Sequence, residues 1–512
     1  MKLNNPIITA KKIFRETLKA RIYDVVHHTP LEKAEKLSKR YHNHIFMKRE
    51  DLQSVFSFKI RGAYNLIKQL TQEEKDRGVI CVSAGNHGQG VAYSAARFGI
   101  EATVVMPITT PPIKVKAVKR LGAKTVLYGD SYSDAAEYCT ELTKKFGQTF
   151  IHPFDHPLVI AGQGTIGKEL LEDASELHKV FVPIGGGGLI SGIACYLKEL
   201  QPSVTIVGVE PEESDGMIRS IQADKRIFLP KTGTFADGVA VKQVGSLTFE
   251  LSRHLVDEFI TVSNDEICSA IENIYDETRA ILEPAGALGM AGLKKYLEQN
   301  PETKDEHLVA ISSGANMSFE RLQFVAERAQ IGEKRETLLA IKLPERAGAL
   351  FELCEKVVSD RPITEFNYRY RSPNSAYIFV GIENIQVNDK KRFCQKLAEH
   401  SYEYIDLTEN ELAKEHIRHM VGGPRLDSIE NEVLYRFRFP DRPKALLEFL
   451  IMLGSQWNIS LFHHRSHGTD FNRVLIGLQV PPEDKDRFKD TLANMTFSYT
   501  DETDNSAYQL FL

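Results

Sequence analysis

Strands and helices are expected to alternate between residues 45 and 325, and this alternation constrains the fold more than any other feature of the chain. Amphipathic helical stretches occur, for example, at 90–96 and 114–121. The short apolar runs expected to be strands are 79–82, 102–106, 125–128, 179–182, 205–209 and 308–311. Strands that are apolar along their whole length need helices on both faces of their sheet. The pattern therefore predicts an α/β fold with parallel sheets.

Length and composition narrow the class of protein further. A chain of 512 residues predicts two to four domains, and a formal net charge of −5 gives no reason to expect a nucleic acid or an anionic membrane as partner. The six cysteines include no Cys-x-x-Cys pair, which argues against a disulfide framework or a zinc site and fits a reducing compartment. The first residues lack the apolar core of a signal peptide, and no apolar run is long enough to span a bilayer. We therefore expect a cytoplasmic protein.

The C-terminal part of the chain contains an internal repeat. Residues 338–381 align without a gap onto 434–477, an offset of 434 − 338 = 96, and 11 of the 44 positions are identical. The identities include Pro344/Pro440, Arg346/Arg442, Ala349/Ala445, Leu350/Leu446, Ile363/Ile459, Phe366/Phe462 and Arg369/Arg465. Each copy reads strand, turn, helix, strand, turn, strand. Such a unit cannot bury its sheet alone, so we expect the two copies to pack together; chance similarity is the alternative.

Domain boundaries follow from these patterns. We expect a catalytic domain at 1–325, a charged helical linker at 326–335, and two small α+β domains at 336–408 and 431–503.

A single lysine is the first candidate for chemistry. Lys59 lies in the segment Ser57-Phe58-Lys59-Ile60-Arg61-Gly62-Ala63, between small polar and aromatic neighbours. Its amine can form a Schiff base with an aldehyde cofactor once burial or nearby cations lower its pKa. Most lysines are solvated surface charges, so this segment alone would be weak evidence.

A glycine run supplies a second candidate site. It comprises Gly185, Gly186, Gly187 and Gly188, followed by Leu189, and it lies between an expected strand and an apolar helix. Four glycines let successive backbone N–H groups face a phosphate at a helix N-terminus. A flexible loop is the alternative, but linkers rarely join a buried strand to a buried helix.

Two further strand ends carry polar groups. The first is Ser83-Ala84-Gly85-Asn86-His87-Gly88, in which Asn86 offers an amide donor for a phenolate oxygen; a capped turn is the alternative interpretation. The second is Ser312-Ser313-Gly314, which puts a hydroxyl at the carboxyl end of a strand, where ligands bind in open α/β sheets.

Two other motifs favour structural interpretations. The run from Gly162 to Gly167 matches the dinucleotide fingerprint G-x-G-x-x-G, but the strand candidate before it, 158–161, is short, and no acidic residue occupies the expected position downstream. His463-His464-Arg465-Ser466-His467 resembles a metal-binding run, but its counterpart in the first repeat is Asn367-Tyr368-Arg369-Tyr370-Arg371. A partly exposed strand explains it better, and we assign no metal site.

Taken together, the four segments resemble one family. The motifs around Lys59, Asn86, Gly185 to Leu189 and Ser312 occur in the order and spacing of the serine/threonine dehydratases, pyridoxal-phosphate enzymes of fold type II, the fold of the tryptophan-synthase β-subunit. The resemblance covers roughly residues 5–325. The repeated C-terminal module resembles the ACT-like regulatory pair found in this family, which extends the match over nearly the whole chain.

The resemblance implies a role for each matching residue. Lys59 would carry pyridoxal 5′-phosphate as a Schiff base, and Asn86 would bond the 3′ oxygen of the cofactor. The backbone of Gly185 to Leu189 would hold the phosphate, and Ser312 would face the ring nitrogen. The substrate carboxylate would be received by Ser83, Ala84, Gly85, Asn86 and His87. A second acidic residue of the family's cation site is missing here, because Gly216 follows Asp215 in the Glu210-Pro211 segment.

The resemblance also implies an activity. It is the dehydration and deamination of L-threonine and L-serine to a 2-oxo acid and ammonia, the first step of isoleucine biosynthesis. Isoleucine would inhibit a homotetramer, and valine would oppose it. Alternatives within the same cofactor class are a serine racemase or a β-replacement enzyme. Outside it are an NAD-dependent oxidoreductase built on Gly162 to Gly167, an inactive amino-acid sensor and, for the repeats alone, a plain oligomerisation module.

Overall fold

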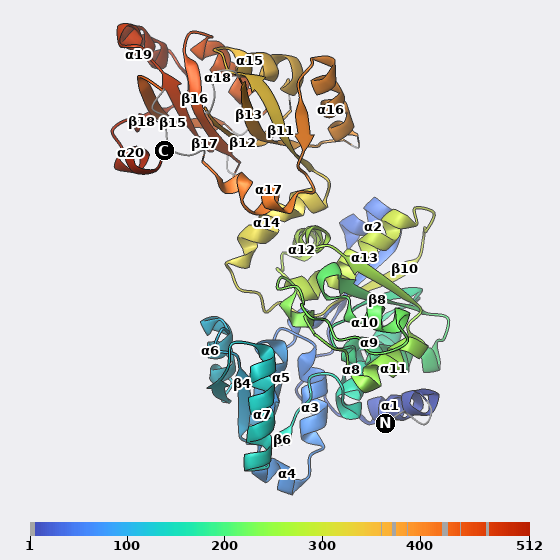
Figure 1. Ribbon diagram of the computed structural model, residues 1–512. Coiled ribbons are helices and arrows are strands. Elements are labelled where there is room, and N and C mark those ends of the chain that lie inside the picture. The colour runs from blue at the N-terminus through green and yellow to red at the C-terminus, as the bar shows by residue number, and fades with distance from the viewer. Residues whose placement is uncertain are drawn as a thin grey trace. The chain divides into compact units, whose positions relative to one another are not determined.

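The protein consists of two compact units (Figure 1). The N-terminal unit comprises residues 1–332 and the C-terminal unit residues 333–512. The structure is a computed structural model that describes residues 6–359, 361–370, 375–386, 388–421, 429–440, 442–466 and 471–512. Among these residues, no helix is both long and apolar enough to cross a membrane.

The N-terminal unit alternates strands and helices as the sequence predicts. Its strands are β1 (Leu31–Lys33), β2 (His44–Arg49), β3 (Val79–Val82), β4 (Ala102–Met106), β5 (Lys124–Leu127), β6 (Thr149–Phe150), β7 (Lys179–Pro183), β8 (Thr205–Pro211), β9 (Glu258–Val262) and β10 (His307–Ser312). Its α-helices are α1 (Pro6–Lys19), α2 (Glu35–Tyr41), α3 (Lys59–Lys68), α4 (Gln72–Arg77), α5 (Asn86–Arg97), α6 (Pro112–Arg120), α7 (Tyr132–Phe146), α8 (Pro157–Asp173), α9 (Gly188–Leu200), α10 (Gly216–Gln222), α11 (Ser246–Leu255), α12 (Asn264–Thr278), α13 (Pro284–Gln299) and α14 (Arg321–Gly332).

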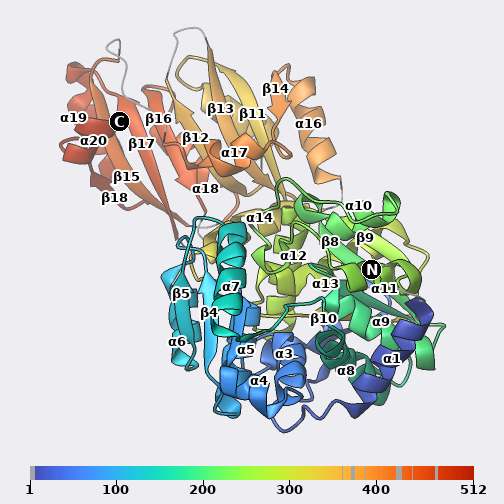
Figure 2. The same cartoon turned by 60° about the horizontal axis from the view of Figure 1, so that its bottom comes forward.

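The strands form two sheets. The smaller sheet has the order β5-β4-β3-β6 and is wholly parallel. Its central strands β3 and β4 are buried along their whole length because both faces are covered: α7 packs on one face, and α3, α5 and α6 pack on the other (Figure 2). The larger sheet has the order β1-β2-β10-β7-β8-β9, in which only β1 runs antiparallel to its neighbour. Helices α8 and α9 cover one of its faces, and α12 and α13 cover the other.

The C-terminal unit is built around one eight-stranded sheet. The strand order is β14-β11-β13-β12-β16-β17-β15-β18. The strands are β11 (Glu336–Pro344), β12 (Ile363–Arg369), β13 (Ser375–Glu383), β14 (Tyr404–Asp406), β15 (Glu432–Pro440), β16 (Asn458–Arg465), β17 (Phe471–Gln479) and β18 (Tyr499–Asp501). The helices are α15 (Ala349–Leu353), α16 (Asp389–Glu399), α17 (Glu411–Glu415), α18 (Ala445–Leu453), α19 (Lys485–Ala493) and α20 (Ser506–Phe511). One apolar core unites α15, α16, α18 and α19 with the strands beneath them.

The two repeats join through their equivalent second strands, β12 and β16. These strands pair antiparallel, and Asn367 lies opposite His463. The same two positions are equivalent in the repeat, since 463 − 367 = 96, so the pairing is centred on an internal pseudo-two-fold axis. Beside the axis, the equivalent rings of Phe366 and Phe462 meet edge to face with centroids 5.0 Å apart. The prediction that the two copies pack together is confirmed.

The histidine run that begins at His463, beside this axis, lies on a strand, as predicted. His463 and His464 belong to β16, and Nε2 of His464 is 3.1 Å from the backbone oxygen of Ile363. His467 lies outside the described residues.

The dinucleotide-like motif does not follow a strand. Gly162 to Gly167 and the preceding strand candidate at 158–161 lie inside α8, so the expectation of a strand there is wrong. The glycines permit close helix contacts instead. A Cβ at Gly162 would lie 2.6 Å from the backbone oxygen of Arg61, and a Cβ at Gly164 would lie 3.0 Å from that of Gly192. The motif therefore serves helix packing, and the oxidoreductase alternative loses its basis.

We predict that Gly162→Ala destabilises the N-terminal unit. Alanine in a helix interior is normally the more stable residue by about 0.5–1 kcal/mol. Here the new methyl group would force α8 away from α3, at a cost of about 1–3 kcal/mol. Thermal unfolding should show the loss as a fall of several degrees in Tm. Gly216→Ala is the control, because its Cβ would lie 3.4 Å from the nearest atom, a Leu229 methyl group. Equal melting temperatures for the two variants would contradict the packing role.

Candidate active site

The predicted site segments meet in one cavity of the N-terminal unit. The cavity has an empty volume of about 480 Å³. It is lined by Phe58, Lys59, Asn86, Pro153, Phe154, Gln163, Pro183, Gly185, Gly186, Gly187, Gly188, Leu189, Gly238, Val239, Glu283, Ala285 and Ser313. Lysine, asparagine and the glycine run, which are more than a hundred residues apart at their extremes, therefore share one space.

Lys59 begins α3 and is held there by the backbone. The N–H of Phe58 donates to the Ser313 oxygen (3.2 Å), and the N–H of Ala315 donates to the Phe56 oxygen (2.9 Å). The Lys59 ammonium forms no hydrogen bond or ion pair with any described residue and lies 5.0 Å from the centroid of the Phe58 ring. Burial lowers its pKa to about 8, and the Glu283 carboxylate acts in the opposite direction. An amine with this pKa is partly neutral, and therefore nucleophilic, near neutral pH.

Arg61, two residues further along α3, anchors the helix. Its guanidinium is fully buried and is bound by two carboxylates, Glu50 (2.7 Å from both Nε and Nη2) and Glu169 (2.5 Å from Nη1). Lys48 is equally buried and pairs with the same Glu169 at 2.8 Å. The network ties α3 to α8 and to the end of β2. It leaves Arg61 unable to reach the cavity.

The glycine run forms the turn between β7 and α9. Gly187 has φ +92°, a left-handed conformation that favours glycine, and α9 begins at Gly188. The ring of Phe154 lies so close that a Cβ at Gly186 would be 2.3 Å from it. The hydroxyl of Thr248 donates to the Gly186 oxygen (2.6 Å), which fixes the loop from the other side. The backbone N–H groups at this helix start form a cradle for an anion.

Asn86 begins α5 and is the one residue of its motif that lines the cavity. Its Nδ2 donates to Oε1 of Glu283 (2.5 Å), and its Oδ1 accepts from Nδ2 of Asn316 (2.7 Å). Ser83, Ala84 and Gly85 form the turn before it, in which the Ser83 hydroxyl accepts from the Gly85 N–H (3.2 Å).

His87 points away from this cavity. Its Nε2 is 2.8 Å from the Ile151 oxygen, and burial together with the Lys59 charge lowers the pKa of the imidazole to about 3. The ring is therefore neutral and donates to that carbonyl oxygen.

Ser312 is the last residue of β10 and Ser313 follows it, and it is Ser313 that lines the cavity. Its hydroxyl donates to the Ala285 oxygen (3.2 Å). The hydroxyl of Ser312 is buried without a hydrogen-bond partner among the described residues, and Ser312 is not part of the cavity wall. Adjacent strand residues point to opposite faces, so one residue of register separates the two placements.

Among the residues that sequence reasoning did not single out are Phe154, Gly238 and Glu283 of the cavity wall and Asn316, which donates to Asn86. Phe154 lies in a loop and Gly238 in a single 3-10 turn, Asp237–Val239, and neither segment has a distinctive sequence pattern. Glu283 precedes Pro284 at the start of α13, a position that usually indicates helix capping. Asn316 follows the predicted Ser-Ser-Gly turn and could have been found as an amide close to that turn.

The carboxylate of Glu210 binds backbone N–H groups at the N-terminus of α10. Oε1 and Oε2 of Glu210 accept from the N–H groups of Met217 and Ile218, both at 2.9 Å, and burial raises the pKa of the carboxyl to about 8. Asp215 pairs with Arg219 at 2.7 Å. Within the described part of the chain, no group of three or more histidine, cysteine, aspartate or glutamate side chains could hold a metal ion.

Comparison with known proteins assigns the class. Residues 22–314 match the family described as "Pyridoxal-phosphate dependent enzyme", and residues 327–417 and 425–512 match the "C-terminal regulatory domain of Threonine dehydratase". The fold and the site thus define a pyridoxal-phosphate enzyme of fold type II with a regulatory region.

Individual relatives narrow the assignment. The biosynthetic L-threonine dehydratase of Burkholderia multivorans is 47% identical over 97% of this chain and 98% of its own length. That of Escherichia coli is 45% identical over 97% and 96%. Among solved structures, threonine deaminase isoform 2 from Solanum lycopersicum matches with a TM-score of 0.62 and 47% identity, over 63% of this chain and 88% of that one. The chain belongs to the family of biosynthetic threonine dehydratases.

The cavity fits the cofactor of this family. Lys59 offers an amine with a lowered pKa, and the glycine turn offers a cradle in which side chains have no room. Asn86 offers an amide N–H between them. A phosphorylated pyridine aldehyde has one group for each of these donors.

We predict that Gly186→Ala weakens cofactor binding. The new Cβ would overlap the Phe154 ring and distort the cradle, at a cost of about 1–3 kcal/mol or a 5- to 150-fold loss of affinity. The dissociation constant of pyridoxal phosphate can be measured by titrating the visible absorbance of the bound form.

A second variant makes this prediction specific. A Cβ at Gly188 would meet the backbone and Cβ of Phe154 rather than its ring. Phe154→Ala should therefore restore affinity in the Gly186→Ala background but not in the Gly188→Ala background. Equal rescue in both backgrounds would contradict the assigned contacts.

Proposed function

We propose that the chain catalyses the dehydration and deamination of L-threonine, and of L-serine, to a 2-oxo acid and ammonia. The observation that carries the proposal is the convergence of Lys59, Asn86 and the glycine turn on one cavity. The relatives' names and the matched regulatory region support threonine as the main substrate. The maize serine racemase, at 34% identity, covers 63% of this chain, about the share occupied by the N-terminal unit, whereas the remaining unit matches a regulatory domain named for threonine dehydratase, so a racemase is not favoured.

The chain's own residues would hold the cofactor at three points. Lys59 would bond the aldehyde carbon, the backbone of Gly185 to Leu189 would bind the phosphate, and Asn86 would donate to the 3′ oxygen. Bound pyridoxal phosphate withdraws electrons from the Cα of an amino acid and so acidifies its proton.

A serine would complete the set at the ring nitrogen. The sequence predicts Ser312, and the cavity wall favours Ser313 instead. A hydroxyl can bond a neutral ring nitrogen without protonating it, which favours elimination of a β-substituent over racemisation.

Lys59 would also move the proton. Its amine, whose pKa is lowered by burial, would take the Cα proton of the bound amino acid. The β-hydroxyl would leave as water, which requires a proton delivered to its oxygen, and hydrolysis of the released 2-imino acid would give the 2-oxo acid and ammonia. The turn from Ser83 to His87 would receive the substrate carboxylate through its N–H groups at the start of α5.

We expect Lys59→Ala to abolish both the visible absorbance of the bound cofactor and turnover. The assay is release of 2-oxo acid from threonine and from serine, and the loss of rate should exceed about 10³-fold because the nucleophile and the base are removed together. Lys68→Ala, at the other end of α3, is the control. Normal turnover in Lys59→Ala would refute the proposed function.

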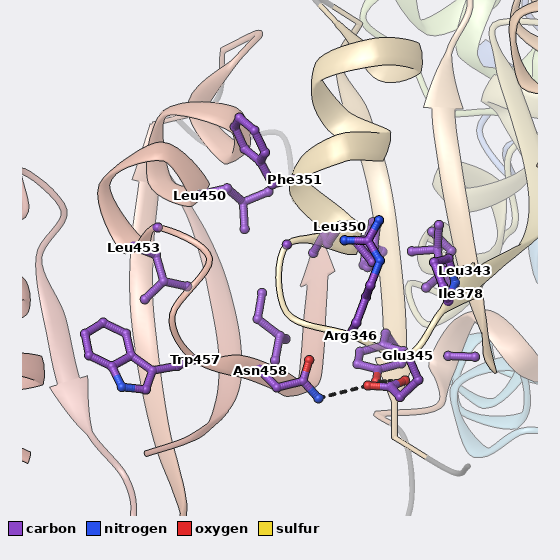
Figure 3. Close-up of a pocket in the computed structure, with 18 residues that line it drawn as sticks. Leu343, Glu345, Arg346, Leu350, Phe351, Ile378, Leu450, Leu453, Trp457 and Asn458 are labelled. Carbon is purple, nitrogen blue, oxygen red and sulfur yellow. Dashed lines mark hydrogen bonds between the residues drawn. The ribbon is translucent and has the colours of Figure 1, made fainter. Parts of the chain in front are cut away.

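The C-terminal unit would bind the effectors. One pocket of about 530 Å³ lies between the repeats (Figure 3). It is lined by Leu343, Pro344, Glu345, Arg346, Gly348, Ala349, Leu350, Phe351, Phe366, Tyr368, Ala376, Ile378, Leu450, Leu453, Gly454, Trp457, Asn458 and Ile459. Apolar side chains form most of the wall, and Glu345 and Arg346 provide opposite charges at one end. A zwitterion with a branched aliphatic side chain, such as isoleucine or valine, suits this arrangement.

Polar contacts pre-order that charged end. Glu345 accepts from the Tyr368 hydroxyl (2.6 Å) and from Nδ2 of Asn458 (3.0 Å), so its carboxylate is fixed by both repeats (Figure 3). We assign the effector's ammonium group to Glu345 and its carboxylate to Arg346.

The pseudo-two-fold axis generates a second pocket. It has an empty volume of about 580 Å³ and contains the equivalents of the first, such as Pro440, Arg442 and Phe462. Arg361 replaces Trp457, and His464 replaces Tyr368. These exchanges make the second pocket the more polar one, so we assign isoleucine to the first pocket and the weaker or opposing effector to the second.

Localisation, domain boundaries and assembly are also part of the proposal. The six cysteines are unpaired thiols, five of them buried, which fits a cytoplasmic protein. The catalytic domain, the linker and the two ACT-like domains are proposed as bounded above, and the assembly is proposed to be a homotetramer.

We predict that Glu345→Gln raises the isoleucine concentration for half-inhibition by at least tenfold, with normal activity in the absence of isoleucine. The change removes the negative charge that would face the ligand's ammonium group. The amide oxygen can still accept from Asn458, and the amide nitrogen can donate to the Tyr368 hydroxyl, so the side chain stays in place. About 1.5 kcal/mol corresponds to that tenfold factor. Glu399→Gln, on the exposed side of α16, controls for net charge. Unaltered inhibition in Glu345→Gln would exclude this pocket as the isoleucine site, and no inhibition of the unmodified protein would favour the plain oligomerisation module.

A further inference from the structure

Three side chains form a hydrogen-bonded chain whose direction is fixed. It starts at the backbone oxygen of Val55, which can only accept, and Nδ2 of Asn316 donates to it (2.8 Å). The same nitrogen donates to Oδ1 of Asn86 (2.7 Å). Nδ2 of Asn86 must then face Glu283, to which it donates at 2.5 Å. Starting from a carbonyl, the amide orientations of both asparagines follow without ambiguity.

This direction leaves one donor for a ligand. Nδ2 of Asn86 carries two hydrogens, and only one is used by Glu283. Asn86 has no other side-chain partner among the described residues and lines the cavity. If the amide were reversed, it would present an oxygen to the ligand's oxygen and repel it.

Glu283 does not act as an ordinary helix cap. It occupies the N-cap position of α13, but its side chain forms no capping hydrogen bond and turns to Asn86 instead. The space around the carboxylate is fitted to it, because a Cβ at Gly314 would lie 2.6 Å from Oε1 and one at Gly238 would lie 3.6 Å away. Glycine at position 314 therefore leaves the room that this side-chain position needs, while the distance from Gly238 is an ordinary van der Waals contact.

The charges around Glu283 come from three other elements. Lys59 reaches it from α3, Lys114 from α6 and Asp237 from the turn before Val239. Asp237 is already neutralised by Lys114 (2.5 Å) and by Arg321 of α14 (3.2 Å). Lys59 has no such partner, so Glu283 is the carboxylate that acts on it.

We propose that Glu283 is a positioning residue with two separable effects: its oxygen fixes the Asn86 amide toward the ligand, and its negative charge holds a proton on Lys59. The proposal rests on the proposed function only in assigning Asn86 to the cofactor. The charge effect concerns Lys59 in the cofactor-free protein and is independent of any substrate.

The two groups titrate in neighbouring ranges. Burial raises the pKa of Glu283 to about 7, against the opposing effect of the Asn86 hydrogen bond, and burial lowers the pKa of Lys59 to about 8. A charged Glu283 favours the protonated form of Lys59. Once the pH is high enough to remove that proton, the neutral amine can attack an aldehyde. Removing the charge of Glu283 removes the influence that raises the pKa of Lys59, so the amine becomes reactive at lower pH.

The test is the titration of Lys59 in the full-length protein freed of cofactor. Reductive methylation with formaldehyde, read at Lys59 by mass spectrometry across a pH series, gives the midpoint directly. We expect Glu283→Gln to lower this midpoint by about one pH unit, since one nearby opposite charge is lost. Glu283→Asp keeps the charge but is too short to reach Asn86, so it should leave the midpoint unchanged. Glu210→Gln, a second buried carboxyl outside the cavity, should also leave it unchanged.

The positioning effect is tested separately by cofactor affinity. Asn316→Leu removes the donor that orients Asn86 and should weaken pyridoxal phosphate binding about tenfold, the value of one net hydrogen bond, without moving the Lys59 midpoint. Glu283→Asp should weaken binding similarly.

The outcomes keep this inference distinct from the proposed function. An unmoved midpoint in Glu283→Gln overturns the charge effect, and unaltered affinity in both Asn316→Leu and Glu283→Asp overturns the positioning effect. If Glu283→Gln does not fold, Glu283→Ala with the same readout must lower the midpoint as well. Absence of threonine turnover with these shifts present would refute the proposed reaction and leave the role of Glu283 standing.

Discussion

The pairing of Arg61 with Glu50 and Glu169 is the interaction on which the active site depends. All three side chains are inaccessible to water, so removing one partner would leave an unpaired buried charge at a cost of about 3–5 kcal/mol. Residues two apart on a helix point about 200° away from each other. Fixing Arg61 toward α8 therefore turns Lys59 toward the cavity, without any contact to its amine. The ion pair contributes orientation more than stability, because buried pairs seldom exceed their own desolvation cost.

The same division between anchoring and reacting groups recurs around the cavity. The Phe154 ring and Thr248 fix the glycine turn, and the Val55 oxygen with Asn316 fixes Asn86. Each group that would touch the cofactor is thus oriented by a neighbour whose own hydrogen bonds or packing are already complete. Such support restricts the reacting groups to one geometry before any ligand arrives.

The sequence predicted those features whose signal is local. An apolar run indicates a buried strand such as 102–106, and consecutive glycines indicate the turn at Gly185. The repeat is recognised by its fixed offset along the sequence. Features that depend on distant partners were missed. Glu283 looks like a helix cap in sequence, and only the fold brings it 2.5 Å from Asn86. Likewise, Gly162 begins a run that matches the dinucleotide fingerprint, but the residue lies inside α8, where its close contacts are with α3. The choice between Ser312 and Ser313 depends on a single residue of strand register.

The pseudo-two-fold pairing of β12 with β16 has a consequence for how the regulatory unit can change. Residues of both repeats line each pocket, so neither repeat forms a pocket by itself. Duplicated sequences can usually diverge independently. Here, however, a substitution in the shared core affects the pockets on both sides of the axis. Divergence is then confined to the few positions that face a single pocket, such as 368 and its counterpart 464, or 457 and its counterpart 361. Any difference in ligand preference between the two pockets would therefore depend on very few positions.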